Sequence, residues 1–462
     1  MNSPIDIQPA NGGLPIKMFL SPEMMPDLET IAQLERLSGT EGLAHHVAVL
    51  PDVHRKSRNL SPTGTVVASR NAIVPRAVDT GINCGMRMVR TDIDLREFTA
   101  PVLDRLFAEL KATIPVYLHQ EDTLRDEDVY DILVQGGEWS RKRFGLDDVE
   151  MSCIEDRGAM PTDAKSAEEI IATMPRKSIK KGRKVLGTLG DGNHFLELQE
   201  IVEVLDEEIA RALGLHKGKA FFMLHTGSRA VGSKMMKGFL REYEEKHFPN
   251  GDQGSPIWTL QIDSDDGLKY AYAVSAASNF GFANRIAITE MLRQAVQKVL
   301  ADSMLCMPLL YDCAHVSIKK EQWNGEHVWI HRHGASRALP AAQYAEHPIF
   351  CKTGQPVPIP GSMGHSSYVG VADVRAEQAF FSVNHGAGRV MDKPEASSTF
   401  SERQVETEMA EKNIRLYRYN SDNIAEQAPG SFKDISQVIE TMSDLALAKP
   451  VVKLRPVAVL KG

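Results

Sequence analysis

The chain has 462 residues, 42% of them hydrophobic and 25% charged, which is typical of a globular protein with a large buried core. Its 53 basic and 61 acidic side chains give a formal net charge of −8, which argues against non-specific wrapping of nucleic acid by bulk charge. The net charge does not exclude a local basic groove. Length alone favours about three domains.

Cysteine usage and the N-terminal sequence predict a cytoplasmic protein. The cysteines are odd in number, widely spaced and without a Cys-x-x-Cys pair, which favours a reducing compartment over a disulfide framework. They are Cys84, Cys153, Cys306, Cys313 and Cys351. The first residues lack the basic start and apolar core of a signal peptide, and no run approaches the ~20 apolar residues of a membrane span.

The first quarter of the chain mixes turns, strands and short helices. Turn-rich sequence fills residues 1–50 and contains one helical pattern over 21–39. Strand-like runs at 47–54 and 87–95 both end in polar residues. Apolar residues at i, i+3, i+4 and i+7 spacing predict a helix over 100–114.

The middle of the chain begins with a charged region and continues with apolar patterns typical of strands and helices. Residues 121–164 are poor in apolar pattern, so we expect loops and solvated helices there, followed by a basic run at 175–184. Residues 185–205 are interpreted as a strand, a Gly-rich turn and a second strand. Residues 219–247 predict a buried strand, a polar turn and a helix.

The longest helical pattern covers residues 271–304, where Gly281 is a candidate interruption. A further helix is predicted over 402–416. Because the chain has no internal repeat and no low-complexity linker, a single large α+β domain is favoured over three separate ones.

Four histidines share one sequence context, and one cysteine resembles them. His194, His225, His315 and His385 each follow an apolar, strand-like run, and Cys84 lies between glycines in "GINCGMR". Strand ends are places where side chains converge on a cleft. Imidazole and thiolate suit Zn, Mn, Fe or Co better than Mg, and a cysteine can bridge two ions. Taken singly, each residue is more commonly structural, and no His-Glu-x-x-His motif supports a metal site.

Other segments are candidates for phosphate binding. "HTGSRAVGSK" and "PIPGSMGHSS" could hold phosphate oxygens, although each alone is more commonly an ordinary turn. No Walker loop and no Gly-x-Gly-x-x-Gly after a strand is present. In "SVNHGAGRVM", the glycines permit close backbone approach and Arg389 offers a fork for phosphate, so His385 could be a base, a metal ligand or a nucleophile. The basic run at 175–184 is either a solvated face or a nucleic-acid patch.

Nine segments in order resemble the signature blocks of the RtcB family of RNA-splicing ligases, from about Leu50 to Gly462. They are "LPDVH", "GINCGMR", "GTLGDGNHFLE", "HTGSR", "YDCAH", "HRHGASRA", "IPGSMGHSSYV", "NHGAGRVM" and "LRPVAVLKG". The resemblance implies one RtcB-like domain over 1–462, with mixed and antiparallel sheets flanked by helices. Residues 1–46 would then be an N-terminal extension, and 121–184 a charged, partly basic, insertion-like region.

The resemblance also implies an activity, namely GTP- and Mn-dependent joining of RNA 3′-phosphate and 5′-hydroxyl ends in tRNA splicing and RNA repair. His385 would be the nucleophile that attacks the α-phosphate of GTP and then passes GMP to the RNA 3′-phosphate. The 5′-hydroxyl would displace GMP, after prior hydrolysis of any 2′,3′-cyclic phosphate. A monomer is expected.

The family's site residues can be carried over position by position. Cys84 would be a bridging thiolate for two Mn²⁺ ions, or a ligand of a single ion, together with His194, His225 and His315. Arg229 and Arg389 would bind RNA or GTP phosphates. The residues expected to contact GTP are Asn193, His194, Phe195, Glu197, His315, Pro360, Gly361, Ser362, Met363, Ser367, His385, Gly386, Ala387, Gly388 and Lys461.

Three departures from the family's usual pattern suggest a divergent member. Gly81 stands where many members have a metal-binding aspartate, and Asp79 is the nearest acid that could replace it. His333 stands where a lysine is common, and Phe432 where a tyrosine is frequent. Two other functions therefore stay open, a metal-dependent cyclic phosphodiesterase or phosphatase on the same scaffold and a non-catalytic RNA- or nucleotide-binding relative.

Overall fold

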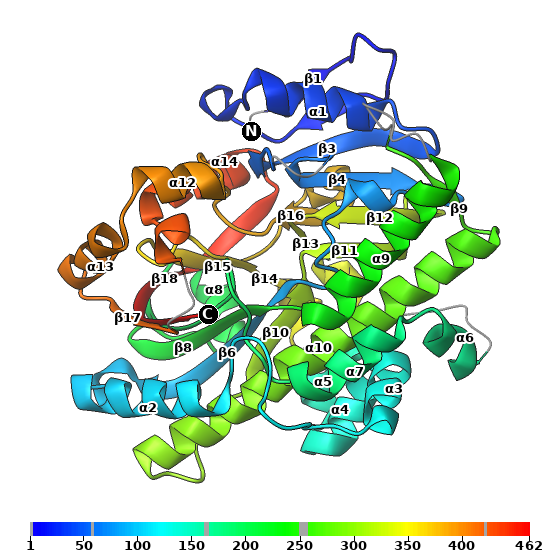
Figure 1. The fold of residues 1–462 in the computed structure, drawn as a ribbon. Helices are drawn as coiled ribbons and strands as arrows, with labels where there is room; N and C mark the ends of the chain where they lie inside the picture. The colour runs from blue at the N-terminus through cyan, green and yellow to red at the C-terminus, as the bar shows by residue number, and fades with distance from the viewer. Residues whose placement is uncertain (1–2, 57–59, 161–165, 249–256, 420–422) are drawn as a thin grey trace.

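Strands from distant parts of the chain combine into two main sheets (Figure 1). The computed structural model describes residues 3–56, 60–160, 166–248, 257–419 and 423–462. The first sheet has the order β1 (Ile5–Ile7), β2 (Ile16–Met18), β3 (Leu43–His54), β4 (Thr63–Ser69), β12 (Glu326–His333) and β11 (Val316–Trp323). Its β2–β3 pair is parallel and its other pairs are antiparallel.

The second sheet carries the strands that lead to the predicted site. Its order is β10 (Leu309–Ala314), β6 (Gly85–Asp94), β8 (Lys219–Thr226), β7 (Phe195–Val204), β18 (Ala448–Lys461), β15 (Ser367–Ala372) and β14 (Pro356–Ile359). β17 (Arg415–Arg418) adds a parallel strand to β18. Two short pairs complete the described strands, β13 (Ala335–Arg337) with β16 (Ser382–Asn384) and β5 (Ala72–Ile73) with β9 (Leu260–Gln261). The predicted α+β fold with mixed and antiparallel sheets is confirmed.

Helices flank these sheets. The described α-helices are α1 (Leu28–Ser38), α2 (Ala100–Thr113), α3 (Asp126–Gln135), α4 (Gly137–Phe144), α5 (Asp148–Ser152), α6 (Ala167–Ala172), α7 (Arg176–Val185), α8 (Glu207–Leu213), α9 (Arg229–His247), α10 (Asp265–Leu300), α11 (Phe350–Thr353), α12 (Lys393–Thr399), α13 (Glu402–Glu411) and α14 (Ile435–Asp444). Within the described ranges, no helix combines the length and apolar character that crossing a lipid bilayer requires.

Helix α10 runs without interruption through Gly281, so the predicted break there is wrong (Figure 1). A Cβ at Gly281 would lie 2.9 Å from the Cβ of Asn83, so glycine lets the helix pack closely on the loop before Cys84. Helix α10 is buried around most of its middle, where it contacts α2, α3, α4 and α9. The glycine therefore serves helix packing beside the predicted site.

Two other predicted elements differ from the structure. The first strand expected within 185–205 is absent, because Gly187, Gly190 and Gly192 take positive φ values and turn the chain before β7. The helix expected over 402–416 ends at Glu411, since Asn413 has a left-handed conformation that turns the chain into β17.

The charged region 121–164 forms helices, as expected, but they are not only solvated. Its helix α3 buries Val129, Ile132 and Leu133 against α10, which matches an i, i+3, i+4 stripe too short to stand out among the charges. Residues 161–165 of this region lie outside the described ranges.

Candidate active site

The predicted cysteine and histidines converge at one end of the second sheet. Cys84 directly precedes β6, His194 precedes β7, His225 lies at the end of β8 and His315 follows β10. Pairing of β8 with both β6 and β7 sets His225 opposite Met86 and Phe195, beside the other two side chains. Strand register therefore brings together ligand types that are up to 231 positions apart in sequence, from Cys84 to His315.

Donor atoms of this cluster face one another at short range. Cys84 Sγ lies 3.2 Å from His225 Nε2 and 3.4 Å from His194 Nε2, and the three donor atoms are all within 4.8 Å of one another. His315 Nε2 is 3.1 Å from His225 Nε2. His225 Nδ1 donates to the Asn193 carbonyl at 3.0 Å, which leaves the Nε2 lone pair directed into the cluster.

The electrostatics and donor chemistry of the cluster fit a transition-metal ion. Burial lowers the pKa values of His194 and His315 well below the ordinary range and that of His225 to about 3, which keeps the imidazoles neutral for ligation. Burial also raises the pKa of the Cys84 thiol to about 11. The buried Nδ1 of His315 has no hydrogen-bond partner in the described part of the chain. One thiol and several neutral imidazoles are a typical donor set for such an ion.

His385 follows β16 and is held by a carboxylate from β3. Its Nδ1 lies 2.6 Å from Asp52 Oδ2 and 2.9 Å from the Gly334 carbonyl, and its backbone N–H donates to the same Asp52 oxygen at 3.1 Å. Because both neighbours of Nδ1 are acceptors, the proton of the neutral ring sits on Nδ1. Nε2 then carries the free lone pair, as a nucleophilic imidazole requires.

The glycines after His385 allow this arrangement. Gly388 has a φ of +76°, and a Cβ there would lie 2.3 Å from the Asp52 carbonyl oxygen. A Cβ at Gly386 would lie 2.9 Å from the Pro360 carbonyl oxygen. The Gly-Ala-Gly segment thus lets the His385 loop approach both neighbouring segments closely.

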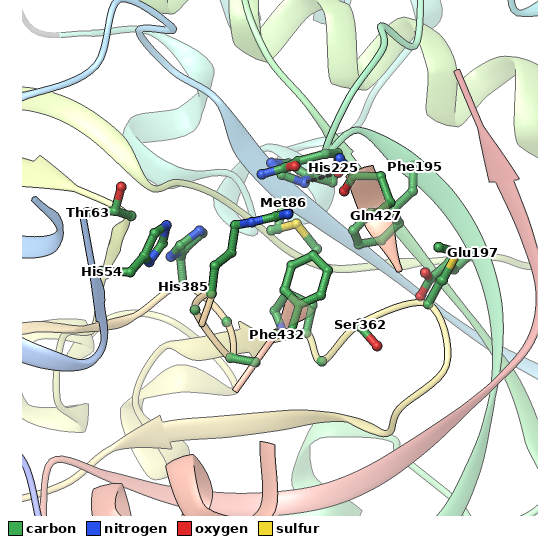
Figure 2. A pocket seen from close by; sticks show the side chains of 18 of the residues that line it. His54, Thr63, Met86, Phe195, Glu197, His225, Ser362, His385, Gln427 and Phe432 are labelled. Atoms are coloured by element: carbon green, nitrogen blue, oxygen red, sulfur yellow. Dashed lines mark hydrogen bonds between the residues drawn. The ribbon is translucent and has the colours of Figure 1, made fainter. Parts of the chain in front are cut away.

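A pocket extends from His385 to Glu197, which lie well apart in Figure 2, with Phe432 between them. The ring of His385 is 4.8 Å from that of His315, so the pocket adjoins the Cys/His cluster. Most of the residues predicted to contact GTP line the pocket: Asn193, Phe195, Glu197, Pro360, Gly361, Ser362, Met363, His385, Gly386, Ala387, Gly388 and Lys461. Ser367 lies behind this lining, where its Oγ accepts from the Gly361 N–H.

Glu197 is the buried carboxyl at the far end of the pocket. Its side chain is almost wholly buried, and Gln199 Nε2 donates to its Oε2 at 2.7 Å. Burial raises the pKa of Glu197 to about 7, against the opposing effects of Gln199 and the Lys461 ammonium. Lys461 itself donates to the Gly192 carbonyl at 2.9 Å.

The two predicted arginines flank the site. Arg229, at the start of α9, donates to His194 Nδ1 at 3.2 Å and to the Val116 carbonyl at 3.2 Å. Arg389 stacks over Phe432 at 4.7 Å, and its buried Nη1 has no hydrogen-bond partner among the described residues. Phe432, which stands where a tyrosine is frequent in the family, thus presents the face of its ring to the Arg389 guanidinium.

Asp79 does not lie in the ligand cluster of the described residues. Its carboxylate binds the Lys56 ammonium and accepts from the Thr80 N–H at 2.6 Å. Burial would raise the pKa of Asp79, but the Lys56 ammonium outweighs it and holds that pKa well below its usual range. His333 is buried, within hydrogen-bonding distance of Ser61 and Thr63, and burial lowers its pKa to about 3. The role of Asp79 as a ligand stays a prediction.

Sequence reasoning missed several residues that shape the pocket. Among them, Asp52 contacts His385 directly. The sequence marked Asp52 only by its place at the polar end of a strand-like run, within "LPDVH". His54, Lys56, Thr63 and Gln427 also line the pocket, as Figure 2 shows for His54, Thr63 and Gln427. His54 ends the same "LPDVH" segment, whereas no local pattern marked Lys56, Thr63 or Gln427.

Comparison with known proteins finds one family over almost the whole chain. A family model described as tRNA-splicing ligase RtcB matches residues 33–462. The chain is 31% identical to the tRNA-splicing ligase RtcB of Nanoarchaeum equitans over 97% of its own length and 95% of the relative's. Relatives with the same description from Thermococcus kodakarensis and Methanococcus maripaludis are each 31% identical and cover 95% and 97% of the chain and 92% and 95% of their own lengths. The chain therefore belongs to the RtcB family of tRNA-splicing ligases.

Proposed function

We propose that this protein is a GTP- and Mn²⁺-dependent RNA ligase that joins 3′-phosphate or 2′,3′-cyclic phosphate ends to 5′-hydroxyl ends, in tRNA splicing or RNA repair. The observation that carries the proposal is the Asp52–His385 contact, which frees Nε2 of a histidine that lines the pocket. A histidine held in this tautomer beside a Cys/His cluster suits nucleophilic attack on phosphorus better than a purely structural role.

The reaction proceeds through three displacements on phosphorus. Nε2 of His385 attacks the α-phosphorus of GTP, so that a P–N bond forms and the P–O bond to pyrophosphate breaks. An oxygen of the RNA 3′-phosphate then attacks the same phosphorus, and the P–N bond breaks. Finally the 5′-hydroxyl attacks the activated RNA phosphate and GMP leaves. A cyclic phosphate is first opened by hydrolysis.

The metal would be held by Cys84, His194, His225 and His315. A bound ion offsets the negative charge of the phosphates. Cys84 would be the ligand shared by two Mn²⁺ ions, with a single ion as the alternative. The backbone carbonyl of Asn193 fixes the orientation of His225 and leaves its Nε2 lone pair for an ion. Arg229 donates to Nδ1 of His194, so the neutral ring carries its proton on Nε2, and ligation through Nε2 would require this contact to change.

The residues at the two ends of the pocket would determine the orientation of bound GTP. Glu197 would accept hydrogen bonds from N1–H and the N2 amine of guanine at one end, while the α-phosphate lies against His385 at the other. The unpaired Nη1 of Arg389 and the backbone of Gly386–Gly388 would face the phosphates. Lys461 would contribute a positive charge near the nucleotide.

Replacing Glu197 by glutamine should weaken GTP binding about 10- to 100-fold, the loss expected for hydrogen bonds to a charged acceptor. The wild type should also lose affinity as the pH falls through about 7, because protonation of Glu197 removes an acceptor. The glutamine variant should lack this pH dependence and should no longer prefer GTP over inosine triphosphate. Titration with each nucleotide at several pH values measures all three effects.

Glu200→Gln provides the matched control, since Glu200 lies on the same strand but pairs with Arg455. It should bind GTP as the wild type does. A Glu197→Gln variant with unchanged affinity and nucleotide preference would contradict the guanine-binding role.

A joining assay tests the proposed function. Two RNA strands, one with a 3′-phosphate and one with a 5′-hydroxyl, are incubated with the protein, GTP and Mn²⁺. We expect a joined product with the wild type and none with His385→Ala. Opening of a cyclic phosphate without joining would instead indicate a hydrolase, and RNA binding without either reaction would indicate a binding protein.

A further inference from the structure

We propose that one exposed face of α9 binds the phosphate backbone of the RNA strand whose end lies in the pocket. This α9 basic face consists of Lys234, Lys237 and Arg241. The inference rests on the proposed function, because that function supplies RNA as the polymer. The proposed surface lies outside the pocket and would bind the strand at a distance from its reacting end.

Helix α9 starts in the site and leads away from it. Its first residue, Arg229, is separated from the end of β8 by two residues and contacts His194. At about 1.5 Å of rise per residue, the three cations lie roughly 7 to 18 Å along the axis from Arg229. A strand that emerges from the pocket beside Arg229 could therefore follow the helix.

A groove runs along the same side of the helix. It is lined by the basic residues Arg76, Lys237 and Arg241, by the acidic residues Asp79, Glu244 and Glu245, and by Thr80 and Leu240. Glu244 is paired with Arg76 at 2.6 Å. Asp79 pairs with Lys56, and Lys56 also lines the active-site pocket. This ion pair therefore lies between the groove and the pocket.

The charges on this face are arranged for an external anion. Positions i, i+3 and i+7 lie on one side of a helix, and all three side chains are exposed. Lys234 and Lys237 have no ion-pair partner in the part of the chain that the structure describes, and Arg241 reaches only Glu245, at 4.0 Å. The helix has no acidic residue before Glu242.

The basic run of α7 is a weaker candidate for the same role. Arg183 of that run pairs with Asp122 at 3.2 Å, and Lys184 donates to the Gln120 carbonyl at 2.9 Å. Arg176, Lys177 and Lys180 of the same run are exposed and have no ion-pair partner among the described residues, so α9 is preferred because it starts at Arg229 beside the site, not because of its charge. On a chain with net charge −8, the unpaired lysines of the α9 basic face stand out from the average surface.

The test is equilibrium binding of a fluorescent single-stranded RNA with a 3′-phosphate, measured by anisotropy at several salt concentrations. The double variant Lys234→Gln/Lys237→Gln should bind about 10- to 30-fold more weakly at roughly 0.1 M salt. The slope of log K against log salt should fall by about 1.4, as expected for two lost phosphate contacts on a single strand. Formation of the protein–GMP adduct should be unchanged, because it needs no RNA.

Two further variants keep the result interpretable. Lys217→Gln/Lys352→Gln removes the same charge from exposed lysines elsewhere, Lys217 lying beyond the opposite end of β8, and should bind RNA as the wild type does. Lys234→Arg/Lys237→Arg keeps the charge and should also bind normally. Unchanged RNA affinity in the Lys234/Lys237 glutamine variant, or an equal loss in the Lys217/Lys352 control, would overturn the proposal. A wild type that binds RNA but forms no GMP adduct would refute the ligase reaction and leave this surface standing.

Discussion

Asparagine in place of Asp52 is expected to slow formation of the protein–GMP adduct by about 100-fold or more, as loss of an orienting carboxylate does in other histidine-dependent sites. The fully buried Asp52 carboxylate accepts from both the ring and the backbone N–H of His385. An asparagine amide can rotate and donate to Nδ1, which would move the ring proton to Nε2 and block the nucleophile. Single-turnover transfer from radiolabelled GTP measures the rate.

Affinity for GTP and metal content should change little in the Asp52→Asn variant, because Asp52 lies outside the Cys/His cluster and is not among the residues that line the pocket. These two measurements separate a positioning role from general damage to the site. Adduct formation at the wild-type rate would contradict the proposed orientation of His385.

Removal of the Cys84 thiol should lower metal affinity by about 100-fold or more, since loss of even an outer partner of a ligand typically costs 10- to 100-fold. Cys84 Sγ faces two imidazoles and would serve every ion held in the cluster. The measurement is metal content by mass spectrometry after dialysis of Cys84→Ala against metal-free buffer. Cys351→Ala is the control, because Cys351 is also a half-buried free cysteine but lies outside the cluster.

Metal retained by Cys84→Ala at the wild-type level would contradict the proposed ligand role. Asp79→Ala is the companion variant for the unsettled carboxylate. A lower Mn²⁺ affinity would make Asp79 a ligand, whereas unchanged affinity would assign it to its ion pair with Lys56.

The positions of the site residues were predictable because strand ends carry a sequence signature. His225, His315 and His385 end or follow a strand, as their apolar runs predicted, whereas His194 lies in the Gly-rich turn before β7; the structure brings all four rings together. Their meeting could not be derived from spacing, because it depends on the pairing of β8 with β6 and β7 and on the separate β13–β16 pair.

Other features depended on contacts that no local pattern records. Asp52 and His385 are 333 positions apart, so their hydrogen bond follows from the approach of the end of β3 to β16. The sequence around Gly281 showed a helix breaker, whereas the structure uses the missing side chain to admit Asn83. The ion pair of Asp79 with Lys56 was equally invisible, which is why the sequence could not show whether that carboxylate faces a metal.

The most direct test is the location of the covalent GMP. The wild-type protein is incubated with GTP and Mn²⁺, kept at alkaline pH to preserve a phosphoramidate, and digested for tandem mass spectrometry. We expect one GMP on the peptide that contains His385, attached through the imidazole. GMP attached to a lysine or to another histidine, or no adduct on a protein loaded with metal, would contradict it.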